Sequence, residues 1–287
     1  MIRADIPHKP TMNIDLHCHS NVSDGLLSPS ELVCRAREKG VAVLALTDHD
    51  DVGGLVEARA AARIHGMRLI DGVEISVTWR THTIHVVGLH IDAHHPRLCE
   101  GLRGIRHGRI ERAKRIAMAL GAHGIKDALE GAYAFAGNPQ LIGRMHFARF
   151  LVEAGHARNL KAVFKKFLVK GKPGYSPHQW AELGEALRWI RAAGGIAVLA
   201  HPGRYDMGAG TMRELLAEFK ALGGGGIEVV TGSHRAEQFP VFAKYSVTYG
   251  FLASRGSDYH GPGESFTELG GLPELPAMCE PVWRDWL

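Results

Sequence analysis

Seven short apolar segments recur along the chain, and their lengths are those of β-strands in a packed sheet. They cover residues 13–17, 41–47, 68–73, 83–89, 195–200, 226–230 and 251–254. Between several of them, as in 29–39 and 52–65, apolar residues follow the 3.6-residue period of an amphipathic helix. Ser28 is a favourable N-cap, and Gly40 and Gly66 stand where these two helices should end. The alternation predicts βα units and a parallel sheet or barrel.

The alternation stops between residues 101 and 172, where only helical patterns occur, at 102–120, 142–154 and 160–168. This region has 15 Lys and Arg against 4 Asp and Glu, whereas the rest of the chain has 19 against 26. We therefore expect an N-terminal extension (1–11), a first barrel part (12–100), a basic helical insertion (101–172) that acts as a substrate lid, and a second barrel part (173–287). A basic region inside an acidic host favours an anionic substrate.

The composition of the 287 residues, 45% hydrophobic and 22% charged with a net charge of +4, is that of a globular protein. No apolar run approaches the roughly 20 residues that a membrane helix needs. Residues 1–11 lack the apolar core of a signal peptide. The four cysteines form no C-x-x-C pair, which is typical of reduced thiols. We expect a cytoplasmic protein without membrane contact, and no obligate protein partner is indicated.

The 18 histidines are the unusual feature of this composition, and six of them stand with carboxylates at or near the predicted strands. The polar residues at these places are Asp15, His17, His19, Asp24, Asp48, His49, Glu74, His85, His201, Asp258 and His260. In a parallel barrel all strand C-termini emerge at one face, so these side chains should meet there. Burying so many carboxylates and imidazoles together would be prohibitive without cations. The sequence therefore predicts a metal centre.

The spacing of His17 and His19 supports this prediction, because residues i and i+2 of a strand point to the same side and can hold one ion. Asp15 shares that side and is either an acceptor that fixes a histidine tautomer or a structural hydrogen-bonding group. Ligands that mix imidazole and carboxylate without thiolate suit Mn²⁺, Fe²⁺ or Zn²⁺.

Several of these motifs together resemble the PHP (polymerase and histidinol phosphatase) family of metal hydrolases. They are Asp15-Leu-His17-Cys-His19-Ser, Ser23-Asp24-Gly25, Thr47-Asp48-His49, Gly72-Val-Glu74-Ile, Ala200-His201-Pro202 and Ser257-Asp258-Tyr259-His260. The resemblance covers roughly residues 12–100 and 173–270 and implies an α/β fold, a distorted seven-stranded (βα) barrel of the PHP/amidohydrolase type. The helical insertion and the segments 141–149 and 170–175 are most similar to the bacterial 3′,5′-nucleotide bisphosphate phosphatase and 5′–3′ exoribonuclease group.

The resemblance also implies a cofactor of two or three divalent ions, with Mn²⁺ first and Fe²⁺ or Zn²⁺ as alternatives. One ion would be held by His17, His19, Glu74 and Asp258, a second by Glu74, His85 and His201, and a third by Asp24, His49 and His260. Asp15 and Asp48 would support these ligands from behind. A metal-bridging hydroxide would attack the phosphorus, so no serine or cysteine nucleophile is needed.

In this interpretation the substrate is a nucleotide bisphosphate, such as pAp, or short 5′-phosphorylated RNA. Arg204, next to the ligand and catalytic residue His201, would contact the scissile phosphate. Arg144, His146 and Lys170 of the insertion would bind a second phosphate. Six other cations of the insertion are expected to form a solvated helix face: Arg103, Arg106, Arg109, Lys161, Lys165 and Lys166.

Two alternatives remain at this point. A histidinol-phosphate-type phosphomonoesterase would use the same barrel, although one small phosphate needs no basic insertion. A non-catalytic, metal-stabilised RNA-binding module is the other alternative, and the complete ligand set is evidence against it.

Overall fold

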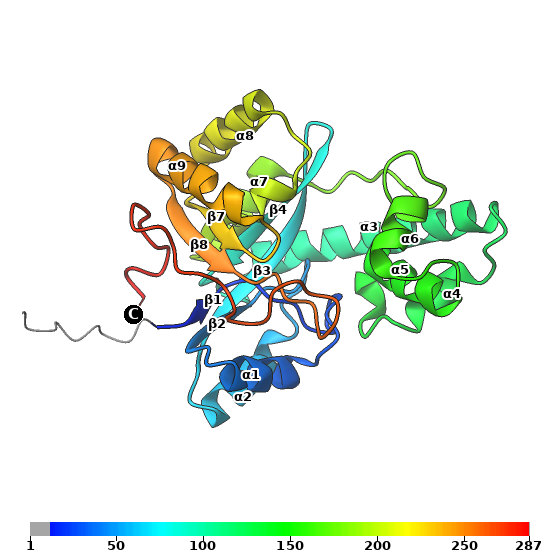
Figure 1. Cartoon of the computed structure of the whole chain (residues 1–287), viewed down its shortest axis with the longest axis horizontal. Coiled ribbons are helices and arrows are strands. Elements are labelled where there is room, and N and C mark those ends of the chain that lie inside the picture. Colours follow the sequence, from blue (N-terminus) through cyan, green and yellow to red (C-terminus); the bar gives the residue numbers. More distant parts are fainter. Residues whose placement is uncertain (1–11, 287) are drawn as a thin grey trace, which may run out of the picture.

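The computed structural model describes residues 12–286, so the expected extension 1–11 lies outside the described residues. Seven strands form one nearly closed barrel (Figure 1). In spatial order they are β1 (Ile14–Asp15), β2 (Val43–Leu46), β3 (Arg68–Trp79), β4 (His82–Leu89), β6 (Ile196–Leu199), β7 (Gly226–Thr231) and β8 (Leu252–Gly256). The first and last strands of this order meet and close the barrel. Leu16, directly after β1, donates its N–H to the carbonyl of Arg255 in β8 at 3.0 Å. The expected barrel is confirmed.

One strand departs from the parallel pattern. β4 runs antiparallel to both of its neighbours, β3 and β6. The reason is local: β3 continues to Trp79, six residues beyond the predicted end of that strand, and only two residues then separate it from β4. Arg80, in this turn, has a φ of 53°. A connection this short can only join antiparallel strands. A two-residue strand, β5 (Ala181–Glu182), pairs with the far end of β3.

The first two helices that cover the barrel begin and end close to the predicted places. The first, α1 (Pro29–Glu38), has Ser28 as its N-cap in a capping box with Glu31. The second, α2 (Leu55–Ile64), begins three residues later than predicted. The remaining covering helices are α7 (Leu183–Ala192), α8 (Ala209–Ala221) and α9 (Phe239–Tyr249), with short 3₁₀ turns η3 (Pro202–Arg204) and η4 (Ala236–Gln238). No helix within residues 12–286 is long and apolar enough to span a bilayer.

The helical insertion projects from one side of the barrel (Figure 1). Its long helix α3 (Pro96–Gly121) begins six residues before the predicted start. The other elements are α4 (Ala128–Tyr133), η1 (Pro139–Leu141), α5 (Arg144–Glu153), α6 (Leu160–Val163) and the π-helical turn η2 (Phe164–Leu168). The predicted helix 160–168 is thus two short elements, because the Val169 N–H bonds to the carbonyl of Phe164.

Two separate apolar cores meet along α3. Leu98, Leu102 and Ile105 belong to the core between the sheet and its helices. Ile116 and Leu120 pack with α4, α5 and η2 in a core that only the insertion contributes to. The long helix therefore holds a small packed unit against the barrel. The division at residues 101 and 172 stays a prediction.

Candidate metal centre

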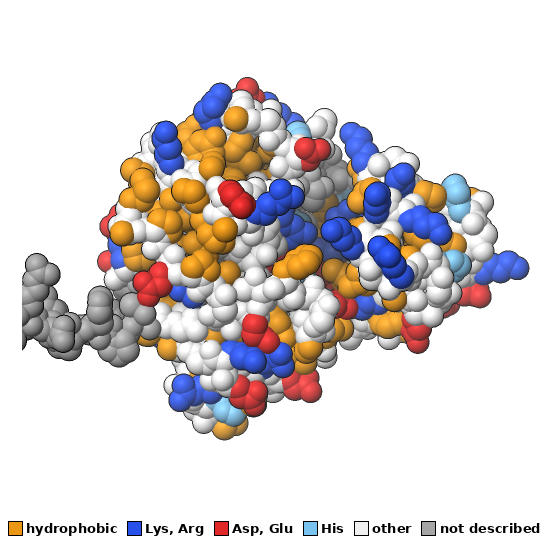
Figure 2. All heavy atoms as spheres, viewed as in Figure 1, with side chains coloured by type: hydrophobic (Ala, Val, Ile, Leu, Met, Phe, Trp, Pro, Cys, Tyr) orange, Lys and Arg blue, Asp and Glu red, His pale blue; other side chains and the backbone are white. Residues whose placement is uncertain are grey.

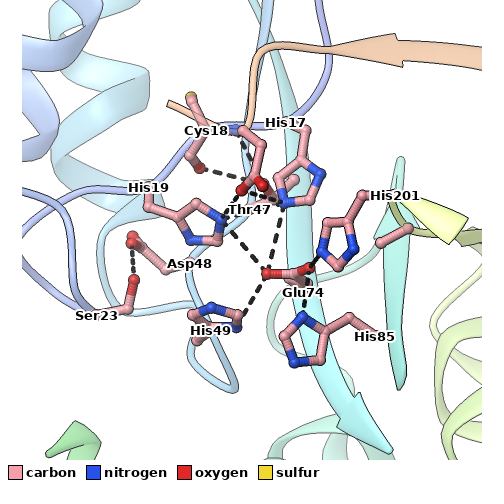
Figure 3. A network of polar contacts seen from close by, with 12 residues as sticks. His17, Cys18, His19, Ser23, Thr47, Asp48, His49, Glu74, His85 and His201 are labelled. Carbon is pink, nitrogen blue, oxygen red and sulfur yellow. Dashed lines mark hydrogen bonds and ion pairs between the residues drawn. The ribbon is translucent and has the colours of Figure 1, made fainter. Parts of the chain in front are cut away.

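The carboxylate of Glu74 lies at the centre of a histidine cluster, as Figure 3 shows. Glu74 is fully buried in the middle of β3. Its Oε1 is 2.9 Å from His85 Nδ1 and 2.8 Å from His201 Nε2. Its Oε2 is 2.9 Å from His49 Nδ1. His85 reaches Glu74 diagonally across the β3–β4 pair, so the antiparallel strand contributes from its middle and not from its end.

His17 and His19 approach the same carboxylate from the chain that follows β1. Their Nε2 atoms are 3.5 Å and 3.4 Å from Glu74 Oε2, and 3.6 Å and 3.3 Å from Asp258 Oδ1. The two Nε2 atoms are 3.1 Å apart. The alternation expected for a strand holds here, since Leu16 and Cys18, on either side of His17, are buried in apolar clusters.

A second group of side chains adjoins the first. His260 Nε2 is 3.4 Å from Asp24 Oδ1, and His49 Nε2 is 3.9 Å from Asp24 Oδ2. The rings of His19 and His260 are stacked, with centroids 4.2 Å apart. The structure thus brings together all nine side chains that the sequence analysis expects as ligands. His19 lies with Asp24, His49 and His260 as closely as it lies with His17 and Glu74.

These donors fit divalent cations. Glu74 Oε2 and Asp24 Oδ1 are buried and accept no hydrogen bond from any described residue, although histidine nitrogens lie nearby. Ligand atoms of three sets converge within 4.8 Å of one another: His19, Asp24, His49 and His260; His17, His19 and Glu74; and His49, Glu74 and His85. Nitrogen and oxygen donors without thiolate match Mn²⁺, Fe²⁺ or Zn²⁺.

The electrostatics of the cluster agree with that fit. Burial and the neighbouring His260 lower the pKa of His19 to about 3. Burial and Arg204 likewise lower the pKa of His201 to about 3. Burial also disfavours the His260 cation, but Asp24 and Asp258 outweigh it and raise the pKa of His260 to about 9. Neutral imidazole is the form that binds a metal, so His19 and His201 are ready as ligands and His260 would release a proton.

Known proteins place this centre in a family. The model of the PHP domain matches residues 15–231. The chain belongs to the PHP family. It is 50% identical over 273 residues to a 3′,5′-nucleoside bisphosphate phosphatase of Chromobacterium violaceum (95% of this chain, 96% of that protein). It is 43% identical over 274 residues to the 5′–3′ exoribonuclease Rnm of Escherichia coli (95% and 93%).

A solved structure shows the same architecture. It is an amidohydrolase from Chromobacterium violaceum that holds sulfate and no metal, with a TM-score of 0.92, 50% identity and 95% of each chain covered. The resemblance found in the sequence, and the barrel that it implied, are therefore confirmed.

One residue of this PHP centre escaped the sequence analysis. Glu228 is 1% exposed in β7, with Oε1 2.7 Å from His17 Nδ1, and its Oε2 accepts the His201 N–H at 2.6 Å. It therefore fixes the tautomer that leaves His17 Nε2 free for an ion. The sequence feature that could have revealed Glu228 is that it is the one carboxylate within the apolar segment 226–230.

Asp15 and Asp48 support the centre through the backbone and hydroxyls. Asp15 accepts N–H groups of Ser257 and Gly270 at 2.8 and 2.9 Å. Its carboxylate contacts no imidazole ring within residues 12–286, so its contacts are those of a structural hydrogen-bonding group, whereas Glu228 contacts the His17 ring. Asp48 accepts bonds from both Ser20 and Ser23 and so fixes the loop that leads to Asp24. Burial raises the pKa of Asp48 to about 6.

The insertion is tied to the PHP centre by two arginines. Arg109, on α3, donates from Nε to Asp50 Oδ2 at 2.8 Å and from Nη2 to the same oxygen. Asp50 follows the predicted ligand His49, has a φ of 51° and accepts the Ser76 N–H at 2.7 Å. Arg106 donates to the Asp50 carbonyl at 2.9 Å. The expectation that Arg106 and Arg109 are solvated is therefore wrong, because both reach across to the ligand loop.

The residues expected to meet the substrate lie at different depths. Arg204 is half exposed, and its Nη1 donates to Asp258 Oδ2 at 3.0 Å. Arg144 makes no ion pair with a described residue, and its guanidinium is 5.7 Å from the Phe164 ring. His146 is 1% exposed and accepts the Gly143 N–H at 3.0 Å, so it holds the start of α5 and does not face solvent. Lys170 is exposed and makes no hydrogen bond or ion pair within residues 12–286.

Further basic groups gather beside Arg144. Arg112 donates to the Ser176 carbonyl at 3.2 Å, and Arg115 donates to the Ser176 hydroxyl at 3.1 Å. Burial, then Arg144 and Arg109, lower the pKa of Arg112 to about 9. Burial and the charge of Arg204 lower the pKa of Arg144. Figure 2 shows Lys and Arg side chains around the hollow between barrel and insertion. This concentration of positive charge favours an anion there.

Proposed function

We propose that the protein hydrolyses the 3′-phosphate of 3′,5′-nucleoside bisphosphates, such as pAp, and releases 5′-mononucleotides from the 5′ end of short RNA. Seven imidazole and carboxylate side chains converge in three sets, and His201 and Asp258 contact two of them, Glu74 and His17. This convergence beside Arg144, which has no ion-pair partner among the described residues, is the observation that best supports the proposal. The activities of the two relatives, a bisphosphate phosphatase and a 5′–3′ exoribonuclease, support the proposal. Because these substrates belong to the cell interior, we also infer a cytoplasmic protein.

Mn²⁺ is the proposed metal, and nine side chains would hold it: His17, His19, Asp24, His49, Glu74, His85, His201, Asp258 and His260. When bound, such ions lower the pKa of water and neutralise phosphate charge. Glu228 holds His17 in one tautomer, and Asp258 keeps Arg204 at the mouth of the centre. Arg204 would bind the scissile phosphate by charge-assisted hydrogen bonds.

Arg144 would bind the 5′-phosphate. Its guanidinium has no carboxylate partner among the described residues, and its pKa is lowered by burial and by the positive Arg204. The two substrate phosphates, one bound at each cation, would neutralise this repulsion. A histidinol-phosphate monoesterase has no use for this second anion site.

Metal analysis of the purified protein, followed by assays on pAp, 5′-phosphorylated oligoribonucleotides and histidinol phosphate, tests the proposal. We expect turnover of the first two. Turnover of histidinol phosphate alone would contradict it, and so would the absence of any phosphate-ester hydrolysis by Mn²⁺-loaded protein.

The Arg144→Ala variant tests the 5′-phosphate contact. It should lower kcat/KM on pAp by roughly 10- to 100-fold, as expected for loss of a charge-assisted contact, while a generic aryl phosphate is hardly affected. Arg158→Ala, an exposed arginine of the same insertion, is the matched control and should change neither rate. Equal losses on both substrates would remove the recognition role of Arg144.

A further inference from the structure

A polar hollow of about 650 Å³ lies beside the metal centre, on the barrel side of its mouth. It is lined by Gly203, Ser233, Arg235, Glu237 and Gln238. Its volume is in the usual range for small-ligand sites, roughly 300–1,000 Å³. The Gln238 amide donates to the Gly203 carbonyl at 3.0 Å, which ties its two walls together.

Asp258 of the metal centre connects the centre to this hollow. The Ser233 hydroxyl donates to Asp258 Oδ2, and Arg204, the neighbour of Gly203, donates to the same oxygen at 3.0 Å. All lining residues belong to the barrel, whereas Arg144 belongs to the insertion. A substrate whose 5′-phosphate meets Arg144 would therefore leave this hollow free.

An exposed aromatic ring stands on the same rim. Phe266 is 97% exposed, more than any other large apolar side chain described. Its neighbour Ser265 accepts the backbone N–H of the ligand His260 at 2.7 Å. On the other side, Thr267 Cβ is 3.0 Å from where a Cβ on Gly232 would lie, directly before Ser233 of the hollow. The chain at Phe266 thus passes between a metal ligand and the hollow, where an exposed ring is suited to stack on a base.

We propose that the hollow and Phe266 bind the second nucleotide of a 5′-phosphorylated RNA substrate. This inference rests on the proposed function and adds to it. In pAp the 3′-phosphorus carries three free oxygens besides O3′, whereas in RNA one of these three is O5′ of the next nucleotide. In both cases the P–O3′ bond breaks, the OH of water joins phosphorus and its proton goes to O3′. Only an RNA substrate therefore needs a binding site for a second nucleotide, which stays bonded to phosphorus through its O5′.

The lining groups match a nucleotide. The Arg235 guanidinium makes no ion pair or hydrogen bond within residues 12–286 and is exposed, so it is free for the following phosphate. Glu237 offers a carboxylate that can accept a bond from a ribose hydroxyl. Phe266 supplies the sequence-tolerant stacking surface.

Comparing kcat/KM on pApA, a 5′-phosphorylated pentaribonucleotide and pAp tests this assignment. Phe266→Ala should lower the values for both RNAs by roughly tenfold, since one stacked base contributes that much. Arg235→Ala should lower the value for the pentaribonucleotide by roughly tenfold, since a charge-assisted contact is lost, and should leave pApA unchanged, because pApA has no phosphate after its second nucleotide. Both variants should change the value for pAp less than twofold. Phe266→Trp should retain RNA hydrolysis, because it keeps the stacking surface. Arg63→Ala, on the distant α2, is the control and should change nothing.

Photocrosslinking gives a readout that needs no turnover. Metal-free protein is irradiated with a 5′-phosphorylated dinucleotide that carries 5-iodouracil in its second position, and the attachment site is mapped by mass spectrometry. We expect attachment at Phe266, and attachment only within the insertion would overturn the proposal.

The kinetic outcomes separate the two proposals. Equal losses on pAp and RNA would overturn the second-nucleotide site, because Phe266 would then serve the first nucleotide or the fold. Unchanged RNA hydrolysis would overturn it as well. Wild-type turnover of pAp without RNA would overturn this site and leave the bisphosphatase proposal standing, whereas turnover of neither would overturn both.

Discussion

Replacement of Arg109 should reveal how strongly the insertion is fastened to the metal-binding loop. The Arg109 side chain is 9% exposed, and its partner Asp50 is fully buried. Removing one partner of a buried ion pair typically costs about 3–5 kcal/mol, because the other charge is left buried. Asp50 would still accept the N–H and hydroxyl of Ser76 at 2.7 and 2.9 Å. We therefore expect Arg109→Met to lower the free energy of unfolding by about 3 kcal/mol, at the low end of that range.

The assay is urea unfolding of metal-free protein, followed by fluorescence and circular dichroism. Methionine keeps the length of the arginine stem, so packing changes little. Asp50→Asn removes the stranded charge, and the double variant should cost at least 1 kcal/mol less than the sum of the single variants. Arg103→Met, on an exposed part of the same helix, is the control and should cost under about 0.5 kcal/mol.

A second consequence concerns the metal. Asp50 follows His49, and its own N–H donates to the carbonyl of Glu74, so it links two ligands. Arg109→Met should therefore also weaken Mn²⁺ binding, measured by titration. A loss of stability under 1 kcal/mol would refute the reasoning, since the pair would then behave like a solvated surface pair.

Three further predictions concern the centre and its surroundings. Glu228→Gln should weaken Mn²⁺ binding by about 10- to 100-fold, because the carboxylate that contacts His17 Nδ1 is lost. Glu182→Gln, at an exposed position, is the control. Equal Mn²⁺ affinities of Glu228→Gln and wild type in titration would contradict the role of Glu228. Chelation should lower Tm by several degrees and added Mn²⁺ should restore it, since ions bind only the folded chain. A Tm unaffected by chelator would contradict this, and would mean that the histidine and carboxylate charges neutralise one another without a metal ion. Burial and then Arg112 lower the pKa of His178 to about 4. As the pH falls below about 6.5 the unfolded chain binds a proton at this histidine, whereas the folded chain binds it only near pH 4, so the free energy of unfolding decreases across that window. His178→Gln should reduce this decrease in unfolding measured against pH, and an unchanged slope would be evidence against the reasoning.

Periodicity and turn residues predicted the strands and helices of the barrel from sequence, since those signals are local. The third strand was predicted too short because Glu74 and Ser76 interrupt its apolar run. Both face the interior, where Glu74 meets the histidines and Ser76 meets Asp50. This strand thus carries polar residues where the core pattern expects apolar ones. Because its end was predicted too early, the short turn to the predicted strand 83–89 was missed, and with it the antiparallel direction of β4.

The proximity of the predicted ligands could be expected from sequence, because strand ends of a barrel converge whatever their distance along the chain. The side chains behind them could not. Glu228 reaches His17 across 211 positions, and Asp50 reaches Arg109 across 59. Neither pair has a spacing rule, since each depends on how the strands and α3 are packed together. The buried position of His146 was likewise invisible to a pattern of charges.

The charge excess of the insertion has two different uses, which composition alone cannot separate. Arg109 and Arg149 are paired with carboxylates of the barrel, Asp50 and Glu264, and Arg149 also donates to the carbonyl of Asp24 at 2.6 Å. Each of these ion pairs has no net charge, so it adds nothing to the positive field, and it holds the insertion against the loops of the predicted ligands. Arg112, Arg115 and Arg144 have no such carboxylate within residues 12–286 and repel one another. Because that repulsion persists until an anion binds, the unpaired arginines are the part of the excess that substrate phosphate would neutralise.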